Sequence, residues 1–412
     1  MEKEIIFGDL ALAFTTDFEH RYDDKGSGAY TNGSFWHPIA PDGYWPLGSV
    51  GTTNYDPISG KMASLCVKRA SNCFNDPLAA PKDYELVWMD KGSGAYKNGS
   101  CWRPIAPEDY VALGVVFVEG FEKPSLHDVV CVKKTLTESA ILGSCLWTDH
   151  GSGAKQSIAC YEVKVPPLMP DSEYGYFAPN TLVAIKNYKK PTDNAGACCL
   201  YLPIPSKAFD PPKKPTLTSH QKPPKESERA IDHVAIVPFT AITDNAKTLE
   251  WKVKHSPFYE VVRYTSYMNE LFIDNQSAEP QTLSKTITLG ISKSISQTFS
   301  VNTGISVTTE TGVSILGTGG KVSCTLSVEL GWSRTTSVEE FREVSVTEQL
   351  TAKPFKAAAL WTTSHMLKVM RVDGTFIGQE LAYETNTDIL IDEFPDGSKE
   401  KDTPQVKKQT HE

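Results

Sequence analysis

The sequence DKGSGAY at residues 24–30 occurs again as DKGSGAY at 90–96 and, shortened to DHGSGA, at 149–154. The first two copies continue in parallel, with NGSFWHPIAP at 32–41 beside NGSCWRPIAP at 98–107. Each unit then closes on an apolar run that ends in lysine, at 65–68, 130–133 and 183–186. Whole units of chain therefore recur three times in the first half.

Within each unit the sequence predicts strands and turns. Short apolar runs are broken by Gly, Pro, Asn and Asp, and no sustained helical period is present. Three such units arranged in a ring, each covering its neighbour's core, predict a pseudo-threefold β domain. The length of the units favours a β-prism, and a β-trefoil stays open.

The Gly-Ser-Gly loops allow two interpretations. As tight turns they need glycine for positive φ and an aspartate to cap the turn. As binding loops they offer a carboxylate to hydroxyl groups, a thin backbone and aromatic rings for stacking, which suits a sugar or a polar lipid headgroup. The third copy lacks the tyrosine and the Trp-x-Pro segment, so a third site is weaker or absent. The candidate ligand-binding residues are Asp24, Gly26, Ser27, Gly28, Tyr30, Trp36, Asp90, Gly92, Ser93, Gly94, Tyr96, Trp102, Asp149, Gly151, Ser152 and Gly153.

The DKGSGA loop, the WxPIAP segment and the Leu-Gly pairs at 47–48 and 113–114 resemble the vacuolar protein sorting-associated protein sixty-two family. The resemblance covers roughly residues 10 to 204. It implies a β-prism-like domain, alone or fused to other modules, with no established enzymatic activity.

The second half contains an unusual tract, SVTTETGVSILGTGGKVSCTLSVELGW, at residues 306–332. Of the 46 residues from 292 to 337, 19 are Ser or Thr, and charges are almost absent. Apolar residues alternate with hydroxyl residues on both sides of the glycine-rich turn at 316–321, which predicts one antiparallel hairpin with an apolar and a polar face. In that hairpin Ile315 faces Val322, Val313 faces Cys324, and Val307 faces Leu330. The residues predicted to insert into a membrane are Ile305, Val307, Val313, Ile315, Leu316, Val322, Leu326, Val328, Leu330 and Trp332.

The two arms of this hairpin, 305–315 and 322–332, have 11 residues each, and a tilted transmembrane β-strand needs about 9 to 11. Only a closed barrel satisfies the backbone in lipid, so insertion requires a homo-oligomer in which each subunit donates two strands. Glu310 and Glu329 would then line the pore and favour cations. The alternative is an ordinary half-exposed hairpin, which also alternates.

The stretch NELFIDNQSAEPQTLSKTITLGIS (269–292), with NQS at 275–277 and PQT at 280–282, resembles the pore-forming module of aerolysin-type toxins. The return strands through AKPF (352–355) to Asp373 and Gly374 match the same plan, in particular its epsilon-toxin and mosquitocidal-toxin branch. The resemblance implies a secreted toxin, with insects as one target, that binds a surface receptor, oligomerises and inserts one hairpin per subunit.

The sequence thus predicts an all-β protein in four parts. These are a threefold β-prism for receptor binding (1–204), a Pro- and Lys-rich linker (205–229), an aerolysin-like module (230–394) with an insertion hairpin at 293–336, and a polar tail (395–412). We call residues 293–336 the Ser/Thr-rich segment. The tail is a solvated terminus or, alternatively, an activation peptide with lysines as cleavage sites.

Other functional classes are disfavoured. A net charge of −9 argues against nucleic acid as a partner. The chain has no nucleophile elbow, zinc-protease motif or phosphate loop, and its nine cysteines fit no zinc spacing, so we expect neither an enzyme nor a cofactor or metal. There is no apolar run of 18 residues and no ordinary signal peptide, so a toxin would be released as a soluble protein by another route or in mature form before acting at the target-cell membrane. The competing hypothesis is a non-toxic glycan-binding or structural β protein, which explains the repeats but not the hairpin.

Overall fold

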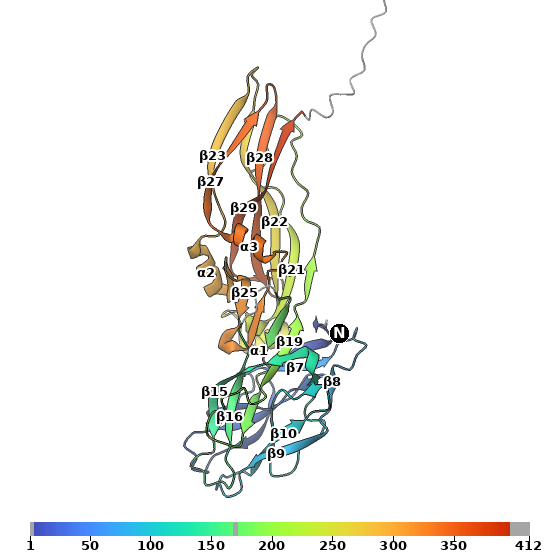
Figure 1. Cartoon of the computed structure of the whole chain (residues 1–412), viewed down its shortest axis with the longest axis vertical. Coiled ribbons are helices and arrows are strands. Elements are labelled where there is room, and N and C mark those ends of the chain that lie inside the picture. The colour runs from blue at the N-terminus through green and yellow to red at the C-terminus, as the bar shows by residue number, and fades with distance from the viewer. Residues whose placement is uncertain (1–3, 168–171, 396–412) are drawn as a thin grey trace, which may run out of the picture.

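The structure is a computed structural model that describes residues 4–167 and 172–395. The predicted tail therefore lies, apart from its first residue, outside the described residues. The molecule is elongated, with the N-terminal half at one end and long strands running away from it (Figure 1). Antiparallel strands are the main regular structure of the described chain, and the α-helices within it are short. The prediction of an all-β fold is confirmed.

The N-terminal half contains three equivalent three-stranded antiparallel sheets, one per repeat, in the orders β3-β4-β6, β9-β10-β12 and β15-β16-β18. Each Gly-Ser-Gly loop joins the first two strands of its sheet. The strands are β3 (Phe18–Asp23), β4 (Ser34–Pro38), β6 (Val50–Thr52), β9 (Asp83–Met89), β10 (Gly99–Ile105), β12 (Val116–Glu119), β15 (Ile141–Thr148), β16 (Ala159–Lys164) and β18 (Leu182–Ile185).

A second sheet completes each repeat, as β1-β2-β7-β5, β11-β13-β8 and β14-β19-β17. The closing strands of the repeats are β7, β13 and β19. The prediction that residues 183–186 close the third unit is wrong, because they lie in and just after β18, which pairs with β16 as β6 pairs with β4. More residues precede the closing strand in the third unit than in the other two. The apolar run ending in lysine at 183–186 therefore belongs to an earlier strand of that unit. The strands are β1 (Ile6–Phe7), β2 (Leu10–Thr15), β5 (Trp45–Pro46), β7 (Ser64–Arg69), β8 (Leu78–Ala79), β11 (Tyr110–Val111), β13 (Cys131–Lys133), β14 (Thr137–Ser139), β17 (Tyr174–Phe177) and β19 (Cys198–Pro203).

Three large rings meet at the centre of the threefold arrangement. Tyr22, Trp88 and Trp147 occupy equivalent positions, two residues before the aspartate of each loop. Their ring centroids lie 5.5 to 6.4 Å apart, and all three side chains are at most 1 % exposed. Each repeat contributes one ring, so a single repeat could not bury its ring without the other two repeats.

The second half is built on a sheet of long strands in the order β20-β21-β22-β28-β29, together with a separate two-stranded ribbon of β23 and β27 (Figure 1). The predicted linker lies along this sheet: its strand β20 pairs with β21, and its Leu217 is buried beside β28. The strands are β20 (Ser206–Ala208), β21 (Ala230–Pro238), β22 (Phe258–Asp274), β23 (Gln281–Leu289), β27 (Val344–Ala352), β28 (Ala357–Met370) and β29 (Phe376–Phe394).

Helices occupy parts of the second half that the sequence pattern assigned to strands. α2 begins after Ser292, whose hydroxyl accepts the N–H of Ile295, and ends at Gly304 with a φ of 81°. α3 begins after Ser333, whose hydroxyl accepts the N–H of Thr336. Serine before a helix and glycine after it are strong boundary signals, and here they outweigh the alternation. The helices are α1 (Leu249–His255), α2 (Lys293–Thr303) and α3 (Arg334–Phe341), with 3₁₀ turns at η1 (Lys134–Leu136), η2 (Phe239–Ala241) and η3 (Thr318–Gly320).

The Ser/Thr-rich segment is not one long hairpin in this structure. Its first arm folds back on itself as β24 (Ile305–Thr308) and β25 (Gly312–Leu316), and its second arm keeps only β26 (Val322–Thr325). Ile315 faces Cys324 instead of Val322, so the register differs by two residues from the predicted one. A shift of two keeps every side chain on its face. The arms are broken because folding back brings the apolar side chains of both arms into one core.

Candidate functional site

The structure brings the Ser/Thr-rich segment onto the N-terminal domain, which the sequence did not predict. β26 pairs with β17 of the third repeat, so β24, β25 and β26 extend the sheet β14-β19-β17 to six strands. The largest core of the molecule joins both halves here: Phe7 lies 5.7 Å from Phe258, and Phe14 lies 4.8 Å from Phe239, between ring centroids.

The predicted membrane-inserting face supplies much of this core. Ile305, Val307, Val313, Ile315, Val322, Leu326, Leu330 and Trp332 are each at most 2 % exposed. Leu316, in the turn, is 71 % exposed and Val328 is 37 % exposed. Burial of this amount of apolar surface stabilises the docked position, so the segment would have to leave the core before it could enter a membrane.

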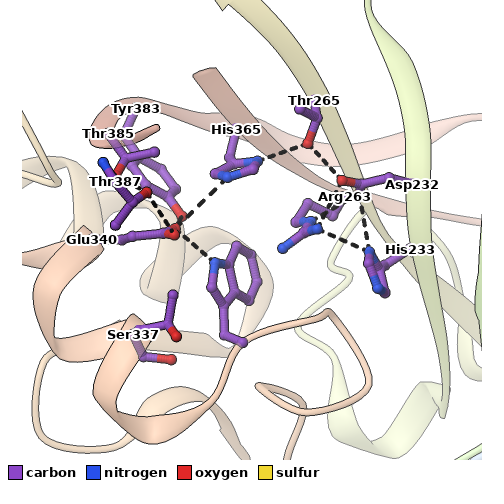
Figure 2. Close-up of polar contacts among 12 residues, drawn as sticks. Asp232, His233, Arg263, Thr265, Ser337, Glu340, His365, Tyr383, Thr385 and Thr387 are labelled. Atoms are coloured by element: carbon purple, nitrogen blue, oxygen red, sulfur yellow. Dashed lines mark hydrogen bonds and ion pairs between the residues drawn. The ribbon is translucent and has the colours of Figure 1, made fainter. Parts of the chain in front are cut away.

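A network of buried polar groups fixes the end of the segment to the long sheet (Figure 2). Glu340 of α3 is its centre. Its Oε2 accepts from Trp332 Nε1 at 2.8 Å and from the Tyr383 hydroxyl at 3.2 Å, and its Oε1 accepts from Thr387 at 3.2 Å. His365 Nε2 lies 3.7 Å from Oε2. Burial raises the pKa of Glu340, and the hydrogen bond from Trp332 opposes that rise.

The Glu340 network continues across β28 and β22 to β21. The Thr265 hydroxyl lies 2.8 Å from His365 Nδ1 and donates to Asp232 at 2.6 Å. Arg263 donates to both oxygens of Asp232 at 2.8 Å and stacks over the Trp332 ring at 4.6 Å. Burial, together with the positive charge of Arg263, lowers the pKa of His365 to about 3. This imidazole is therefore neutral at neutral pH.

The two acids predicted to line the pore lie in different environments. Glu310 is exposed at the turn between β24 and β25. Glu329 is only 6 % exposed, and neither of its carboxylate oxygens has a hydrogen-bond partner.

The Gly-Ser-Gly loops share one set of internal contacts. The aspartate carboxylate accepts the backbone N–H nine residues later, and the serine hydroxyl accepts the N–H of the alanine two residues on. The first contact joins Asp24 to Gly33, Asp90 to Gly99 and Asp149 to Ile158, at 2.9, 3.1 and 3.0 Å. The second joins Ser27 to Ala29, Ser93 to Ala95 and Ser152 to Ala154, at 3.2, 3.1 and 3.1 Å. The two glycines of each loop, Gly26 and Gly28, Gly92 and Gly94, and Gly151 and Gly153, have φ between 76° and 95°.

The three loops interlock around the threefold axis. Each donates one backbone N–H to the next: Tyr30 to His150, Tyr96 to Lys25, and Lys155 to Lys91, at 2.9, 2.8 and 3.2 Å. Trp88 Nε1 also donates to Asp149, and Trp147 Nε1 to Asp24, both at 2.7 Å. The aspartates and serines of all three loops are at most 6 % exposed, so their polar atoms face the domain.

Of the predicted stacking rings, the structure exposes the tyrosines and buries the tryptophans. Trp36 and Trp102 are each 8 % exposed, and their Nε1 atoms donate to serines two residues earlier, Ser34 and Ser100. Neither of these two tryptophans therefore offers an open ring face to a ligand. Tyr30 and Tyr96 are 76 % and 83 % exposed.

The surface of the loops is basic and aromatic. A side chain at Gly151 would meet the Tyr30 ring, and one at Gly26 would meet the Tyr96 ring, so each tyrosine lies on a glycine of the neighbouring loop. The exposed charged side chains of loops 24–33, 90–99 and 149–158 are Lys25, Lys91, Lys97 and Lys155. We call these loops the threefold tip.

Sequence reasoning missed the Glu340 network. Its members come from α3 and four strands that are far apart in the chain, and a lone Glu, His or Arg in an apolar strand carries no motif. The available signal was the presence of Asp232, Arg263 and His365 inside runs of β-branched and aromatic residues, where a charge requires a partner.

Within the described residues, no helix is long and apolar enough to cross a membrane, and no group of three or more potential ligand side chains could hold a metal ion.

The fold and its contacts define a two-part all-β protein, in which a threefold domain carries an elongated module with a docked amphipathic segment. Residues 2–200 match the family described as vacuolar protein sorting-associated protein 62, so the predicted N-terminal resemblance is confirmed. Residues 231–390 match the family described as insecticidal crystal toxin, P42, which confirms that the second half resembles a toxin. The chain is thus a toxin-like protein.

Solved structures that are similar to part or nearly all of the chain include GNIP1Aa and Cry35Ab1. GNIP1Aa from Chromobacterium piscinae shares 26 % identity over 46 % of this chain, with a TM-score of 0.39, and the chain spans 37 % of its length. Cry35Ab1 shares 12 % identity over 95 % of this chain and 91 % of its own, with a TM-score of 0.38. Comparison with curated proteins gives no match.

Proposed function

We propose that the protein is a secreted β-pore-forming toxin with two working parts. The threefold tip binds a glycan or lipid headgroup on the target cell. Bound subunits then assemble, and the Ser/Thr-rich segment leaves its core and enters the membrane as one hairpin per subunit, closing a barrel with its neighbours. Insects are the proposed targets, because the second half matches an insecticidal toxin family.

The observation that carries the proposal is the state of the Ser/Thr-rich segment. Its apolar face is almost completely buried, yet its strands in this structure are short. When these short strands separate, each 11-residue alternating arm can form one long strand. An ordinary surface hairpin would expose its polar face and keep its pairing. The alternation of this segment instead permits a second pairing, as one long hairpin. A membrane would favour that pairing because a closed barrel of such strands satisfies the backbone there.

Attachment to the third repeat offers a physical link between receptor binding and release. β17 belongs to the repeat whose loop contacts the other two at the threefold tip, and it is also the strand on which β26 docks. A displacement of this repeat on receptor binding would therefore act directly on the docked segment.

A disulfide across this junction tests the proposal. The N–H of Ala178 donates to the carbonyl of Lys321 at 2.8 Å, next to the Phe177–Val322 pair, so cysteines at 178 and 321 face each other within bonding range. The oxidised Ala178→Cys/Lys321→Cys variant is expected to bind target membranes and to release less than a tenth of the wild-type dye from vesicles made of them. Reduction should restore release, and each single-cysteine variant should behave as the wild type.

Two outcomes would contradict the proposal. If the oxidised variant releases dye at the wild-type rate, the segment does not need to leave its core. If the wild type binds such vesicles but releases no dye at any concentration, the protein is a glycan-binding β protein without pore activity.

A further inference from the structure

Glu329 is an exception within a well-satisfied interior. Among the described residues, only six buried side-chain nitrogen or oxygen atoms lack a hydrogen-bond partner, and two of them are the carboxylate oxygens of Glu329. Glu340, which is 7 % exposed in the same region, has hydrogen bonds to both of its oxygens. Of these two buried acids, only Glu329 lacks partners, and burying an unpaired carboxylate is strongly unfavourable.

The turn that carries Glu329 is an anchor of the docked segment. The N–H of Leu326 donates to the Val313 carbonyl at 2.7 Å, and the Ser327 hydroxyl accepts the N–H of Val313 at 2.9 Å. The N–H of Trp332 returns to the Ser327 carbonyl at 2.8 Å. Anything that expels Glu329 from the interior therefore disturbs β25 and the start of the Glu340 network together.

Among the described residues, no charged group near Glu329 compensates an ionised carboxylate. Toward β17 it faces Glu173, a like charge, and toward β26 it faces the Cys324 thiol, whose pKa burial raises well above its usual value. On the side of β21 and β22, His233 and Arg263 lie against Gly331, two residues after Glu329, but Arg263 is already paired with both oxygens of Asp232. Burial, with a smaller contribution from the charge of Glu173, raises the pKa of Glu329 to about 7.

We propose that Glu329 is a protonation-dependent lock on the Ser/Thr-rich segment, in which the neutral acid holds the turn 326–331 in place and loss of its proton to solvent opens it. This inference rests on the proposed function, because the segment that opens is the one that would enter the membrane. There the same side chain would face water in the barrel, where the ionised form is the stable one.

The direction of the pH effect follows from linkage. The docked acid has a higher pKa, about 7, than the released one, whose ordinary value is 4.5. Docking is therefore favoured fully below pH 4.5 and is weakened as the pH rises through 7. Between pH 5 and pH 9 the opening constant is expected to increase on the order of 50- to 100-fold.

Hydrogen–deuterium exchange of the full chain tests the lock without a membrane. Exchange times are scaled to the intrinsic rate at each pH, and the peptide covering 322–332 is compared with one from β28. The 322–332 peptide should open 50- to 100-fold more between pH 5 and pH 9, while the β28 peptide changes less than threefold. Glu329→Gln should reduce the change to less than threefold, and Glu173→Gln should reduce it in part. Glu339→Gln, at an exposed acid of α3, should keep the wild-type profile.

A flat profile for 322–332 in the wild type would overturn the lock, as would a full rise in both the Glu329→Gln and Glu173→Gln proteins. Glu173 is exposed, so we expect the Glu173→Gln protein to fold. It therefore tests the lock even if the Glu329→Gln protein does not fold. Dye release from vesicles is measured in parallel at each pH. Opening of 322–332 without any dye release would contradict the proposed function and support the lock.

Discussion

At the scale of single residues, the loop aspartates determine how the threefold tip is built. Asp24 accepts hydrogen bonds from a backbone N–H, from Trp147 and from the Tyr55 hydroxyl, the last at 2.8 Å. These donors come from two different repeats. A carboxylate that looks like a ligand-binding group in the sequence is thus an internal acceptor in the fold.

Replacing Asp24 by alanine should lower the free energy of unfolding by about 3 kcal/mol, because it leaves three donors without their charged acceptor. Urea unfolding followed by fluorescence measures the change. Asp42→Ala, at an exposed aspartate, should change it by less than about 0.5 kcal/mol. Equal effects of the two substitutions would show that Asp24 does not organise the loop.

His365 makes the Glu340 network sensitive to acid. Its pKa is about 3 in the fold and 6.5 in its absence, so the fold binds fewer protons here than the unfolded chain does. The stabilisation is fully present above pH 6.5 and is lost as the pH falls toward 3. At pH 5 the loss from this residue is about 2 kcal/mol relative to pH 8.

A His365→Gln variant should therefore lose less stability between pH 8 and pH 5 than the wild type, by about 2 kcal/mol, although it is less stable at pH 8. Thermal or urea unfolding across this range measures the difference. If the free energy of unfolding changes equally with pH in both proteins, protonation of His365 does not destabilise the fold. Protonation of His365 at acid pH and loss of the Glu329 proton at alkaline pH should both destabilise the same docked segment.

At the scale of elements, an ion pair fixes the start of the long sheet. Asp244, after η2, accepts from Arg371, after β28, through both oxygens at 2.8 and 2.9 Å, and from the Tyr259 hydroxyl of β22 at 2.7 Å. Burial opposes ionisation of Asp244, but the hydrogen bonds from Arg371, Tyr259 and the Ala246 N–H, together with the charge of Arg371, outweigh it and lower the pKa to about 2. Three elements thus meet at one carboxylate.

Asp244→Ala should destabilise the protein by about 3 to 5 kcal/mol, because it leaves a buried arginine unpaired. A double-mutant cycle provides the control: Asp244→Ala combined with Arg371→Met should cost less than the sum of the two single variants. Additive losses would show that the two side chains act independently.

At the scale of the whole molecule, the exposed tyrosines of the threefold tip and the docked segment occupy separate regions. Tyr30→Ala with Tyr96→Ala should weaken binding to target membranes at least tenfold, because these are the exposed rings of the tip, while the melting temperature changes by no more than about 2 °C. Binding to isolated membranes and thermal unfolding are measured together. Phe74→Ala, at a residue that is 98 % exposed outside the tip loops, is the matched control. Equal binding by the double variant and the wild type would remove the tyrosines from the proposed receptor site.

Much of the fold was predictable because it rests on local pattern. The repeat around Asp24, Asp90 and Asp149 predicted three β units, and alternation in the Ser/Thr-rich segment predicted which side chains share a face. Faces survive a register shift of two residues, so Val313 and Ile315 share one face as predicted even though their partners differ. The helices after Ser292 and Ser333 were not predicted, because the alternation of the segment is also typical of strands.

The sequence by itself determined the repeat, the strand-rich class and the identity of the apolar face, because each depends on neighbours a few residues apart. Only the tertiary structure decided that β26 joins the third repeat, that Glu340 meets His365, and that Glu329 lies in the interior without a partner. These contacts join residues that are tens to hundreds of positions apart. These contacts are stabilised by the burial of surface between distant parts of the chain, which no local sequence pattern shows.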